Sequence, residues 1–486
     1  IPDGLDTDSA TDWVRNDFDL AGIPGEAGTI SEGEAYNTPG ASNEEYVYVP
    51  PVEPIKIHEV QGSGDVSPLV GETVIVEGIV VGDFQDDLGV NGDLNGFFVQ
   101  EEDTDADLDP ATSEGIFVFN GSNPTVDVAI GDLVRLEGSV SEYFGMTQIS
   151  SFSDDMTVLS SGNPLPAVTA LSLPVTSLDD FESTEGMYVA FPQSLVISEY
   201  YNFGRYGEIV LTTDRRLTPT AEFEPGPDAI DAAADYLLNR ITLDDGRTAQ
   251  NPDPALHPNG MEFDLSNLFR GGDEVANATG VLNYSFDLWR VQPTQDANYT
   301  AVNDRTAAPD AVGGNLTVAS FNVLNYFTTY GSRGADDAEE FTRQRDKIFS
   351  ALAAMDADVV GLIEIENNEA AIVDLVDGLN AVVGAGTYAY IDTGVIGDDE
   401  IKVAYIYKPD TVSPVGDYAI LDSSVDPRFI DTKNRPVLAQ TFVDDVSGGV
   451  FTVAVNHFKS KGSPCDDVGD PNAGDGSGNC NGTRTA

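Results

Sequence analysis

Hydrophobic and polar residues alternate with a period of two through short segments in the first third of the chain. This alternation is typical of strands that bury one face, and the Gly- and Asp-rich stretches between the segments predict turns. The clearest segments are 72–80, 96–100, 115–119 and 133–140. No helical periodicity separates them, so residues 55–165 are predicted to form a small β barrel.

The regions on either side of this barrel are less regular. Residues 166–310 predict a second, more irregular β-rich region, with one short helix within 221–240. Residues 1–50 are rich in Gly, Pro and acidic residues and predict the tail of a small β domain. Three prolines between 47 and 54 predict a linker after it.

The periodicity changes after residue 310. Segments 338–355 and 370–382 repeat apolar residues at helical spacing, and they alternate with apolar strands at 316–323 and 358–365. Further strands are predicted at 388–392, 401–407, 437–442 and 450–456. Alternating helices and strands indicate an α/β two-layer sandwich over residues 315–486. The predicted fold is multi-domain, with all-β regions followed by this α/β domain.

The composition is strongly acidic, because 83 Asp and Glu against 23 Lys and Arg give a formal net charge of −60. A solvated surface suited to salty or calcium-rich water is the simplest explanation. Such a surface repels DNA at long range, but residues 315–486 hold 27 acidic and 12 basic residues, a net of only −15. More than half of the basic residues therefore lie where a polyanion would bind. No apolar run is long enough to predict a membrane span.

The chain has two cysteines, Cys465 and Cys480, which flank a loop rich in Gly, Asp and Asn. A disulfide between them would close a loop of about 15 residues, worth roughly 3 kcal/mol in chain entropy. Such a pair favours an oxidising compartment and therefore export, with two free thiols as the alternative. No signal peptide opens the sequence, which we interpret as a mature or trimmed chain.

Carboxylates stand at the end of one apolar strand of the predicted α/β domain. Glu364 and Glu366 follow the run that begins at residue 358. Open α/β sheets bind ligands at the carboxyl ends of their strands, and carboxylates there suit a hard divalent cation. Period two places both glutamates on the face that carries Val360 and Leu362. A helix-capping or surface glutamate is the alternative.

Two other strand ends carry polar residues of complementary chemistry. Asn322 ends the first strand, and Asn456 and His457 end a later one. Lys459 and Lys461 follow, so one short stretch offers an imidazole and two ammonium groups that can bind a phosphate. A structural histidine is the alternative for His457 considered alone.

Five motifs in one order resemble the endonuclease/exonuclease/phosphatase superfamily: ASFNVLNYF, DADVVGLIEIEN, KVAYIYKP, DPRFIDTKNRPVLAQTF and VNHFKSKG. The chain is similar in particular to the secreted ExeM/NucH-like nucleases of marine bacteria, including its Cys-flanked tail. The segments VEGIVVG, GFFVQEED and GIFVF resemble the OB-fold modules of such nucleases, and residues 1–50 look like the end of a lamin-tail-type domain. The resemblance implies a secreted or cell-surface enzyme that uses Mg²⁺ or Mn²⁺ to hydrolyse extracellular DNA, with RNA as the alternative substrate.

The resemblance also implies roles for individual residues. Glu364 would bind the catalytic cation, with Glu366 as the second candidate, and Asn322 would orient the metal shell or the phosphate. Arg435 would hold the phosphate and the active-site carboxylates. His457 would donate a hydrogen bond to the scissile phosphate, supported by Asn456, and the substrate phosphate would also contact Lys459 and Lys461.

The later motifs of the family, a G-D-x-N segment and a terminal S-D-H segment, are not in these 486 residues. We therefore expect residues 1–486 alone to be nearly inactive and to need the missing C-terminal half of the catalytic domain as a partner. Two other functions stay open at this point. One is a phosphatase of the same superfamily, and the other is a calcium-ordered acidic cell-surface or matrix protein whose truncated domain is not catalytic.

A second candidate metal site lies within the predicted barrel. Four acids occupy loop positions 1, 3, 5 and 12, as in a calcium-binding loop: Asp103, Asp105, Asp107 and Glu114. Leu108 stands at position 6, where such loops have glycine. A structural Ca²⁺ site is one hypothesis for this loop, and a solvated acidic loop is the alternative.

Overall fold

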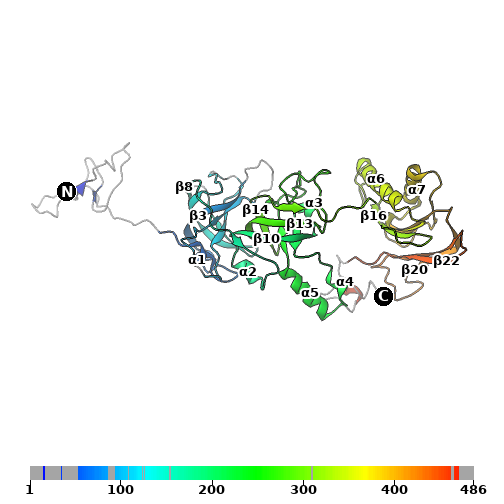
Figure 1. Cartoon of the computed structure of the whole chain (residues 1–486). Helices are drawn as coiled ribbons and strands as arrows, with labels where there is room; N and C mark the ends of the chain where they lie inside the picture. Colours follow the sequence, from blue (N-terminus) through cyan, green and yellow to red (C-terminus); the bar gives the residue numbers. More distant parts are fainter. Residues whose placement is uncertain are drawn as a thin grey trace, which may run out of the picture.

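The computed structural model describes residues 53–85, 94–107, 109–122, 124, 126–152, 155–307, 310–460 and 465–469. It also gives the backbone of two short paired strands, β1 (Arg15–Asn16) and β2 (Glu34–Ala35). The remainder of the expected lamin-tail-like segment 1–50 lies outside the described residues, as do Lys461 and Cys480. The described part is mostly β, with few helices (Figure 1).

The first sheet closes on itself. Its strands are β3 (Thr73–Phe84), β4 (Gly96–Gln100), β5 (Gly115–Phe119), β6 (Leu133–Tyr143), β7 (Met146–Ser150) and β8 (Met156–Ser160). They run in the order β3-β4-β5-β7-β6-β8, and β3 also pairs with β6, so five strands form a barrel with β8 beside β6. The short helix α1 (Ile57–Gln61) packs against the barrel through Ile57 and Val60. The pairing confirms a barrel, and the finer OB-fold assignment stays a prediction.

The second β region is a seven-stranded sheet in the order β15-β13-β14-β12-β11-β10-β9. Its strands are β9 (Thr169–Ala170), β10 (Tyr188–Glu199), β11 (Ile209–Thr212), β12 (Ile241–Leu243), β13 (Glu274–Ser285), β14 (Leu288–Pro293) and β15 (Asn298–Thr300). Helices α2 (Asp179–Glu182) and α3 (Phe203–Tyr206) connect some of them. The guanidinium of Arg290 is buried within the sheet and pairs with Asp244 at 2.6 Å and Glu208 at 3.0 Å.

The short helix expected within 221–240 is present, and a separate helix precedes it. Helix α4 (Pro219–Glu222) ends at Phe223, and α5 (Pro227–Leu238) begins with Pro227 in its first turn. Pro225 cannot donate a backbone hydrogen bond, and Gly226 has φ 147°, so the chain leaves the helical conformation between them.

The barrel and the second sheet are joined through the segment that follows α2. The backbone amide of Thr147 in the barrel donates to the Glu185 carboxylate at 2.9 Å, and the Ser113 hydroxyl donates to the Glu185 carbonyl at 2.6 Å. A Cβ on Gly115 would lie 2.3 Å from Gly186, so the two backbones touch at a pair of glycines. These contacts make the junction close and partly polar.

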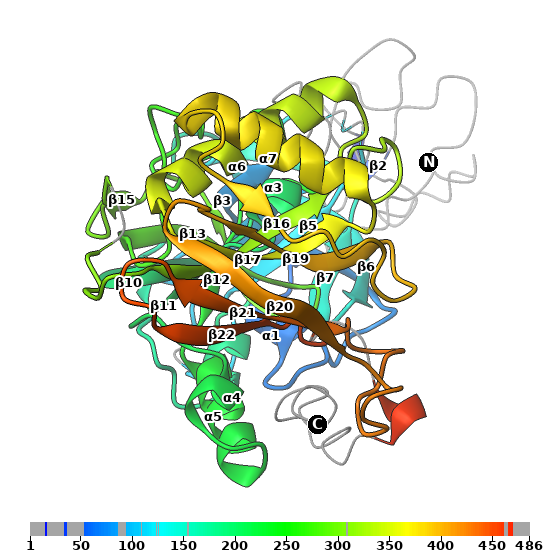
Figure 2. The same ribbon diagram turned by 90° about the vertical axis from the view of Figure 1, so that its right-hand side faces the viewer.

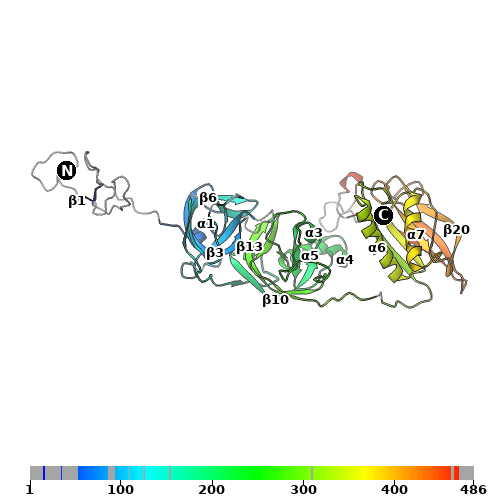
Figure 3. The ribbon, with the colours of Figure 1, turned by 90° about the horizontal axis from the view of Figure 1, so that it is seen from above.

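The last region has three layers rather than the two predicted. Helices α6 (Ala338–Met355) and α7 (Glu369–Val383) cover one face of a four-stranded sheet in the order β16-β17-β19-β18. Its strands are β16 (Val318–Tyr326), β17 (Val359–Glu366), β18 (Ala389–Tyr390) and β19 (Ile401–Tyr407). Figures 2 and 3 show a second sheet on its other face, of strands β20 (Val412–Leu421), β21 (Val437–Asp444) and β22 (Val450–Val455).

The two sheets form separate layers because apolar side chains fill the space between them. Val403 and Tyr405 of β19 pack there against Leu438, Phe442 and Val455 of the second sheet. The Tyr405 hydroxyl donates a hydrogen bond to the Leu438 carbonyl at 2.8 Å. None of the described helices is both long and apolar enough to cross a membrane.

Candidate functional site

A close approach of two strands brings the candidate residues together. A Cβ on Gly361 of β17 would lie 2.3 Å from Cγ2 of Val455, the last residue of β22. Only glycine at position 361 lets the strands lie so near each other. Glu364 and His457, which follow these two positions along the chain, therefore meet, with 3.5 Å between Glu364 Oε1 and His457 Nε2.

The backbone of Glu364 departs from the strand. Its φ is +67°, and the ladders on both sides of β17 shift register around it. Leu362 and Ile365 consequently both face the helices, although they are three residues apart. The predicted alternation, which placed both glutamates on the face of Val360 and Leu362, is wrong for this reason. A left-handed backbone conformation costs free energy at a residue other than glycine. Such strained residues are often found at functional sites.

His457 is mostly enclosed, and its two ring nitrogens differ in surroundings. Its side chain is 19% exposed, and Nε2 faces Glu364, whereas the buried Nδ1 makes no hydrogen bond to the described residues. Burial lowers the pKa of His457 below its usual value, and nearby Arg435 adds to this, although Glu364 opposes it. The imidazole is therefore neutral at pH 7, and Nε2–H can donate to an anionic oxygen.

Arg435 lies beside this pair and is held by an acid that the sequence analysis did not single out. Its Nη2 pairs with Asp399 at 2.8 Å, and the other oxygen of Asp399 pairs with Arg333 at 2.7 Å. Burial opposes ionisation, but the Ile401 amide and the two arginines hold the pKa of Asp399 below its usual value. The buried Nε of Arg435 has no hydrogen-bond partner among the described residues.

The loop that carries Asp399 is fixed by Asn367, directly after β17. The Asn367 side chain donates to the carbonyls of Ile396 at 2.8 Å and Asp399 at 2.9 Å, and accepts from the Ile396 amide. Arg333 and Asp399 complete the charged surroundings of His457, and Asn367 positions the loop that carries Asp399. The only sequence signals for them were an asparagine after a strand and a short acidic run before the next strand.

The remaining predicted residues are placed as follows. Asn322 pairs with Ile363 in the parallel ladder, so it lies beside the strand end that carries Glu364, and its side chain accepts from the Leu324 amide at 2.7 Å. Asn456 donates to the Ala454 carbonyl at 3.2 Å. The Lys459 ammonium is buried and donates to the Ser460 carbonyl at 2.6 Å. Lys461 lies outside the described residues.

Glu366, the second candidate for the metal, is engaged elsewhere. Its buried carboxylate accepts hydrogen bonds from the amide of Thr328 at 2.7 Å and from the hydroxyls of Thr328 and Thr329. Burial alone would raise its pKa, but these hydrogen bonds lower it below the usual value. Glu366 thus anchors the loop after β16, and Glu364 is the glutamate beside His457.

The donor set at Glu364 fits a magnesium-like cation better than a zinc-like one. Among the described residues, Glu364 is the one glutamate that contacts His457, and Asp399 is already paired with two arginines. Mg²⁺ commonly binds through one or two carboxylates, several waters and substrate phosphate oxygens. A single protein carboxylate therefore suits such an ion when a phosphate supplies further ligands.

The predicted calcium loop is not assembled as a four-carboxylate site. Asp103 accepts from the Ala167 amide at 2.8 Å, and Asp105 pairs with Lys56. Asp107 accepts from the Asp109 amide at 2.7 Å, and only Asp107 and Glu114 are linked, through the Asp107 amide. The loop lies between strands β4 and β5 rather than between two helices.

The segment that begins at Cys465 follows this site in the chain. Cys465 is buried. Lys433 pairs with Asp467 at 2.9 Å, which ties the short helix η3 (Asp466–Val468) to the segment before β21. The predicted partner Cys480 lies outside the described residues, so the pairing itself stays a prediction.

The comparisons with known proteins bear on two parts of the chain. Residues 160–304 match a family described as a domain of unknown function (DUF8508). A search of curated proteins finds no match. Several solved structures align with about 30% of the chain, and they are endonuclease/exonuclease/phosphatase-family proteins and other phosphatases.

One is an endonuclease/exonuclease/phosphatase from Bacteroides vulgatus, at 18% identity and a TM-score of 0.23, with 52% of that chain covered. Another is a mannosyl-6-phosphatase from Bacteroides thetaiotaomicron, at 19% identity and 0.23, also with 52% covered. The human Nocturnin catalytic domain with bound sulfate has 20% identity and a TM-score of 0.22, with 52% of that chain covered. The chain thus spans about half the length of these structures. Likenesses of this size carry no argument about function, which has to come from the site itself.

Proposed function

We propose that the chain belongs to a secreted, metal-dependent phosphodiesterase that hydrolyses extracellular DNA. The observation that carries this proposal is the contact between Glu364 and His457, 3.5 Å apart, beside the paired Arg435. A carboxylate for a divalent cation, a neutral imidazole and a guanidinium are the groups that hydrolysis of a phosphate ester requires. The motif resemblance of residues 315–486 supports the same assignment.

Each of these residues has a role that follows from its surroundings. Glu364 would bind a divalent cation, which acts as a Lewis acid and neutralises charge on the phosphate. His457, neutral because of burial, donates from Nε2 to a non-bridging phosphate oxygen. Arg435 is oriented by Asp399, and its guanidinium can donate to the same anion. Donors fixed before the substrate arrives stabilise charge without reorganisation.

Export is the finer part of the proposal. The predicted disulfide between Cys465 and Cys480 and the net charge of −60 both favour an extracellular location. DNA as the substrate is supported by the concentration of basic residues in the last third of the chain, where the candidate site lies. A phosphatase acting on monoesters is the competing function and would use the same groups.

The test is hydrolysis by the full-length protein of three substrates, with Mg²⁺ or Mn²⁺ and again with EDTA. The substrates are supercoiled plasmid DNA, a single-stranded RNA and p-nitrophenyl phosphate. We expect nicking of the plasmid that EDTA abolishes, with turnover of the monoester at least 100-fold slower. Faster turnover of the monoester would identify a phosphatase instead. Plasmid cleavage that persists in EDTA would contradict metal dependence.

A further inference from the structure

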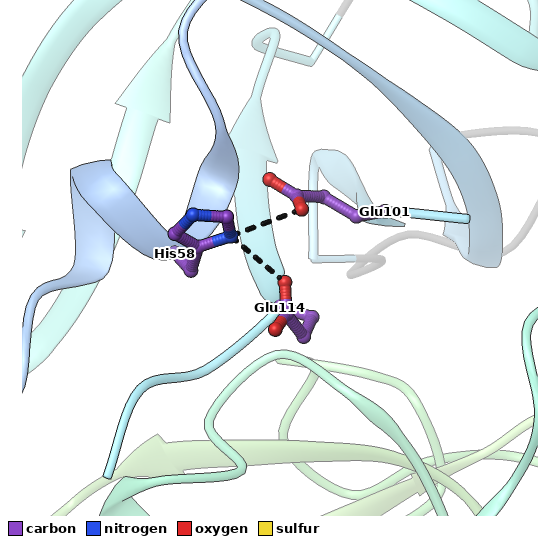
Figure 4. A group of neighbouring side chains, drawn as sticks. All are labelled: His58, Glu101 and Glu114. Carbon is purple, nitrogen blue, oxygen red and sulfur yellow. Dashed lines mark hydrogen bonds and ion pairs between the residues drawn. The ribbon is translucent and has the colours of Figure 1, made fainter. Parts of the chain in front are cut away.

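A histidine and two buried glutamates meet at the junction between α1 and the barrel. His58 lies on α1, Glu101 directly follows β4, and Glu114 directly precedes β5. Figure 4 shows one ring nitrogen of His58 facing both carboxylates, with Nδ1 3.1 Å from Glu101 Oε2 and 3.1 Å from Glu114 Oε2. One ligand atom from each of the three residues lies within 4.8 Å of the others.

The two glutamates are cross-strand neighbours, because the Glu101 amide donates to the Glu114 carbonyl at 3.0 Å, beyond the last pair of the β4–β5 ladder. Like charges directly opposite each other destabilise a sheet, and here both residues are buried, with 2% and 8% of their surface exposed. The fold therefore holds two carboxylates together where a cation would compensate their charge.

A single imidazolium does not satisfy this arrangement. One Nδ1–H can point well at only one acceptor, whereas two carboxylate oxygens lie at the same 3.1 Å from Nδ1. Bonds of about 2.0–2.2 Å from a common metal ion, at tetrahedral or octahedral angles, place neighbouring ligand atoms roughly 2.8–3.6 Å apart. The observed separations correspond to edges of such a coordination shell.

The remaining polar atoms around the cluster also suit a metal. His58 Nε2, on the opposite side of the ring, faces Asp107 Oδ2 at 3.9 Å. Metal-bound histidines commonly direct their second nitrogen toward a carboxylate or water, which fixes the tautomer. The other oxygen of Glu101 accepts from the Ile57 amide, and that of Glu114 accepts from the Asp107 amide at 3.1 Å. Both carboxylates are thereby oriented toward His58.

We propose that His58, Glu101 and Glu114 bind a first-row transition-metal dication of the zinc class. One imidazole nitrogen with two carboxylate oxygens is a donor set for Zn²⁺ or Mn²⁺, whereas Ca²⁺ is bound by oxygen alone. The ion would join α1 to the two strands that precede and follow the acidic loop. This site belongs to the barrel, lies apart from the Glu364–His457 cluster in the chain, and is structural rather than catalytic.

The experiment is a Zn²⁺ titration of the full chain, monitored by calorimetry. Metal analysis after gel filtration gives the amount of zinc that stays bound. All proteins carry Glu364→Gln, so that the candidate catalytic site does not contribute. We expect one equivalent of Zn²⁺, with affinity reduced at least tenfold by Glu114→Gln or His58→Gln. Asp105→Asn removes the same charge from the same loop and should change affinity less than threefold. Equal binding by the Glu114→Gln variant would overturn the proposal, as would no binding at all.

A measurement on the unaltered cluster covers the case in which these variants fail to fold. X-ray absorption at the zinc edge of the Glu364→Gln protein should show one imidazole and two or more oxygen ligands. A zinc environment without an imidazole would overturn the proposal. So would an unchanged thermal transition when Zn²⁺ is added in large excess, because a ligand that binds only the folded state raises the melting temperature.

Discussion

Glu364 has a backbone conformation that residues with a Cβ seldom adopt. Its φ of +67° places it in the left-handed region, at the point where β17 loses its regular register with both neighbours. This conformation costs about 1–2 kcal/mol for an ordinary residue. The rest of the fold compensates this cost. The conformation directs the Glu364 carboxylate toward His457.

The strained backbone predicts an unusual order of stability at this position. Glu364→Gly should be about 1 kcal/mol more stable than Glu364→Ala, because glycine adopts a positive φ without steric cost. Urea unfolding of the two variants measures the difference. Thr452 is an exposed position inside β22 and serves as the control. There the order should be reversed, with Thr452→Ala more stable than Thr452→Gly, since glycine weakens a regular strand. If Glu364→Ala were as stable as Glu364→Gly, or more stable, the inferred backbone strain at residue 364 would be contradicted.

Glu185 is a second residue whose environment opposes its ionisation. It is 2% exposed at the junction of the barrel and the second sheet. Burial raises the pKa of Glu185 well above its usual value, and Glu182 and Glu142 raise it further. One carboxylate oxygen accepts from Thr147, and the other is buried without a partner among the described residues.

The raised pKa fixes the sign of a pH effect. The folded state holds the proton of Glu185 more tightly than the unfolded state, so its contribution is full below pH 4.5 and is lost as pH rises through the folded pKa. Glu185→Gln should therefore match the wild type near pH 4.5 and be more stable by roughly 1–3 kcal/mol at pH 8. Urea unfolding across this range, with the exposed Glu72→Gln as control, checks it. A pH-independent difference would contradict this assignment.

Some site residues were predictable because polar groups at the ends of apolar strands are conspicuous. Glu364 and His457 were found in this way, and the structure brings them into contact. Arg333 and Asp399 lie in irregular loops, where no periodicity indicates which side chains meet. The choice between Glu364 and Glu366 also depended on the register shift, which sequence alternation does not reveal.

At the scale of elements, the position of His457 depends on how closely β22 approaches β17. The contact between Gly361 and Val455 determines this distance. A side chain at residue 361 would push the end of β22, and His457 with it, away from Glu364. Activity and stability should consequently both depend on this glycine.

Gly361→Ala should cost about 1–3 kcal/mol in the free energy of unfolding, because its Cβ would overlap Cγ2 of Val455. Combining it with Val455→Ala should recover at least about 0.5 kcal/mol relative to the sum of the single changes. Gly64→Ala is the control, since a Cβ there would meet nothing within 4 Å. Strictly additive effects of the Gly361 and Val455 changes would contradict the contact.

Most regular elements followed from periodicity. The helix at 338–355 and the strands at 96–100, 115–119 and 401–407 have the predicted bounds. Strand β20 was missed, because Pro414, Gly416 and Asp417 break its alternation and most of its residues are exposed. Its pairing with β21 depends on tertiary contacts, and this is why the second sheet, and hence the third layer, was not predicted.

For the whole molecule, the net charge of −60 dominates the encounter with a polyanion. Repulsion extends over about 30 Å at 0.01 M salt and about 8 Å at 0.15 M, because salt screens charge. An acidic enzyme acting on DNA should therefore bind its substrate more readily as salt increases, which is opposite to the usual behaviour of basic DNA-binding proteins.

We expect kcat/KM on DNA to rise about two- to tenfold between about 10 and 150 mM NaCl, at constant free Mg²⁺. A small diester, bis(p-nitrophenyl) phosphate, should change less than twofold over the same range, since it carries one charge. Initial rates at low substrate concentration provide both numbers. A steady fall of the DNA rate with salt would show that a local basic surface outweighs the global charge.

The central claim is that Glu364 and His457 form a phosphodiesterase site. Its most direct test is kcat/KM of the full-length protein on plasmid DNA, for Glu364→Gln against Glu369→Gln. Glu369 is exposed in the first turn of α7, five residues along the chain. We predict a loss of at least about 100-fold for Glu364→Gln with unchanged folding, and less than twofold for Glu369→Gln. A Glu364→Gln enzyme within twofold of the wild type would contradict the account.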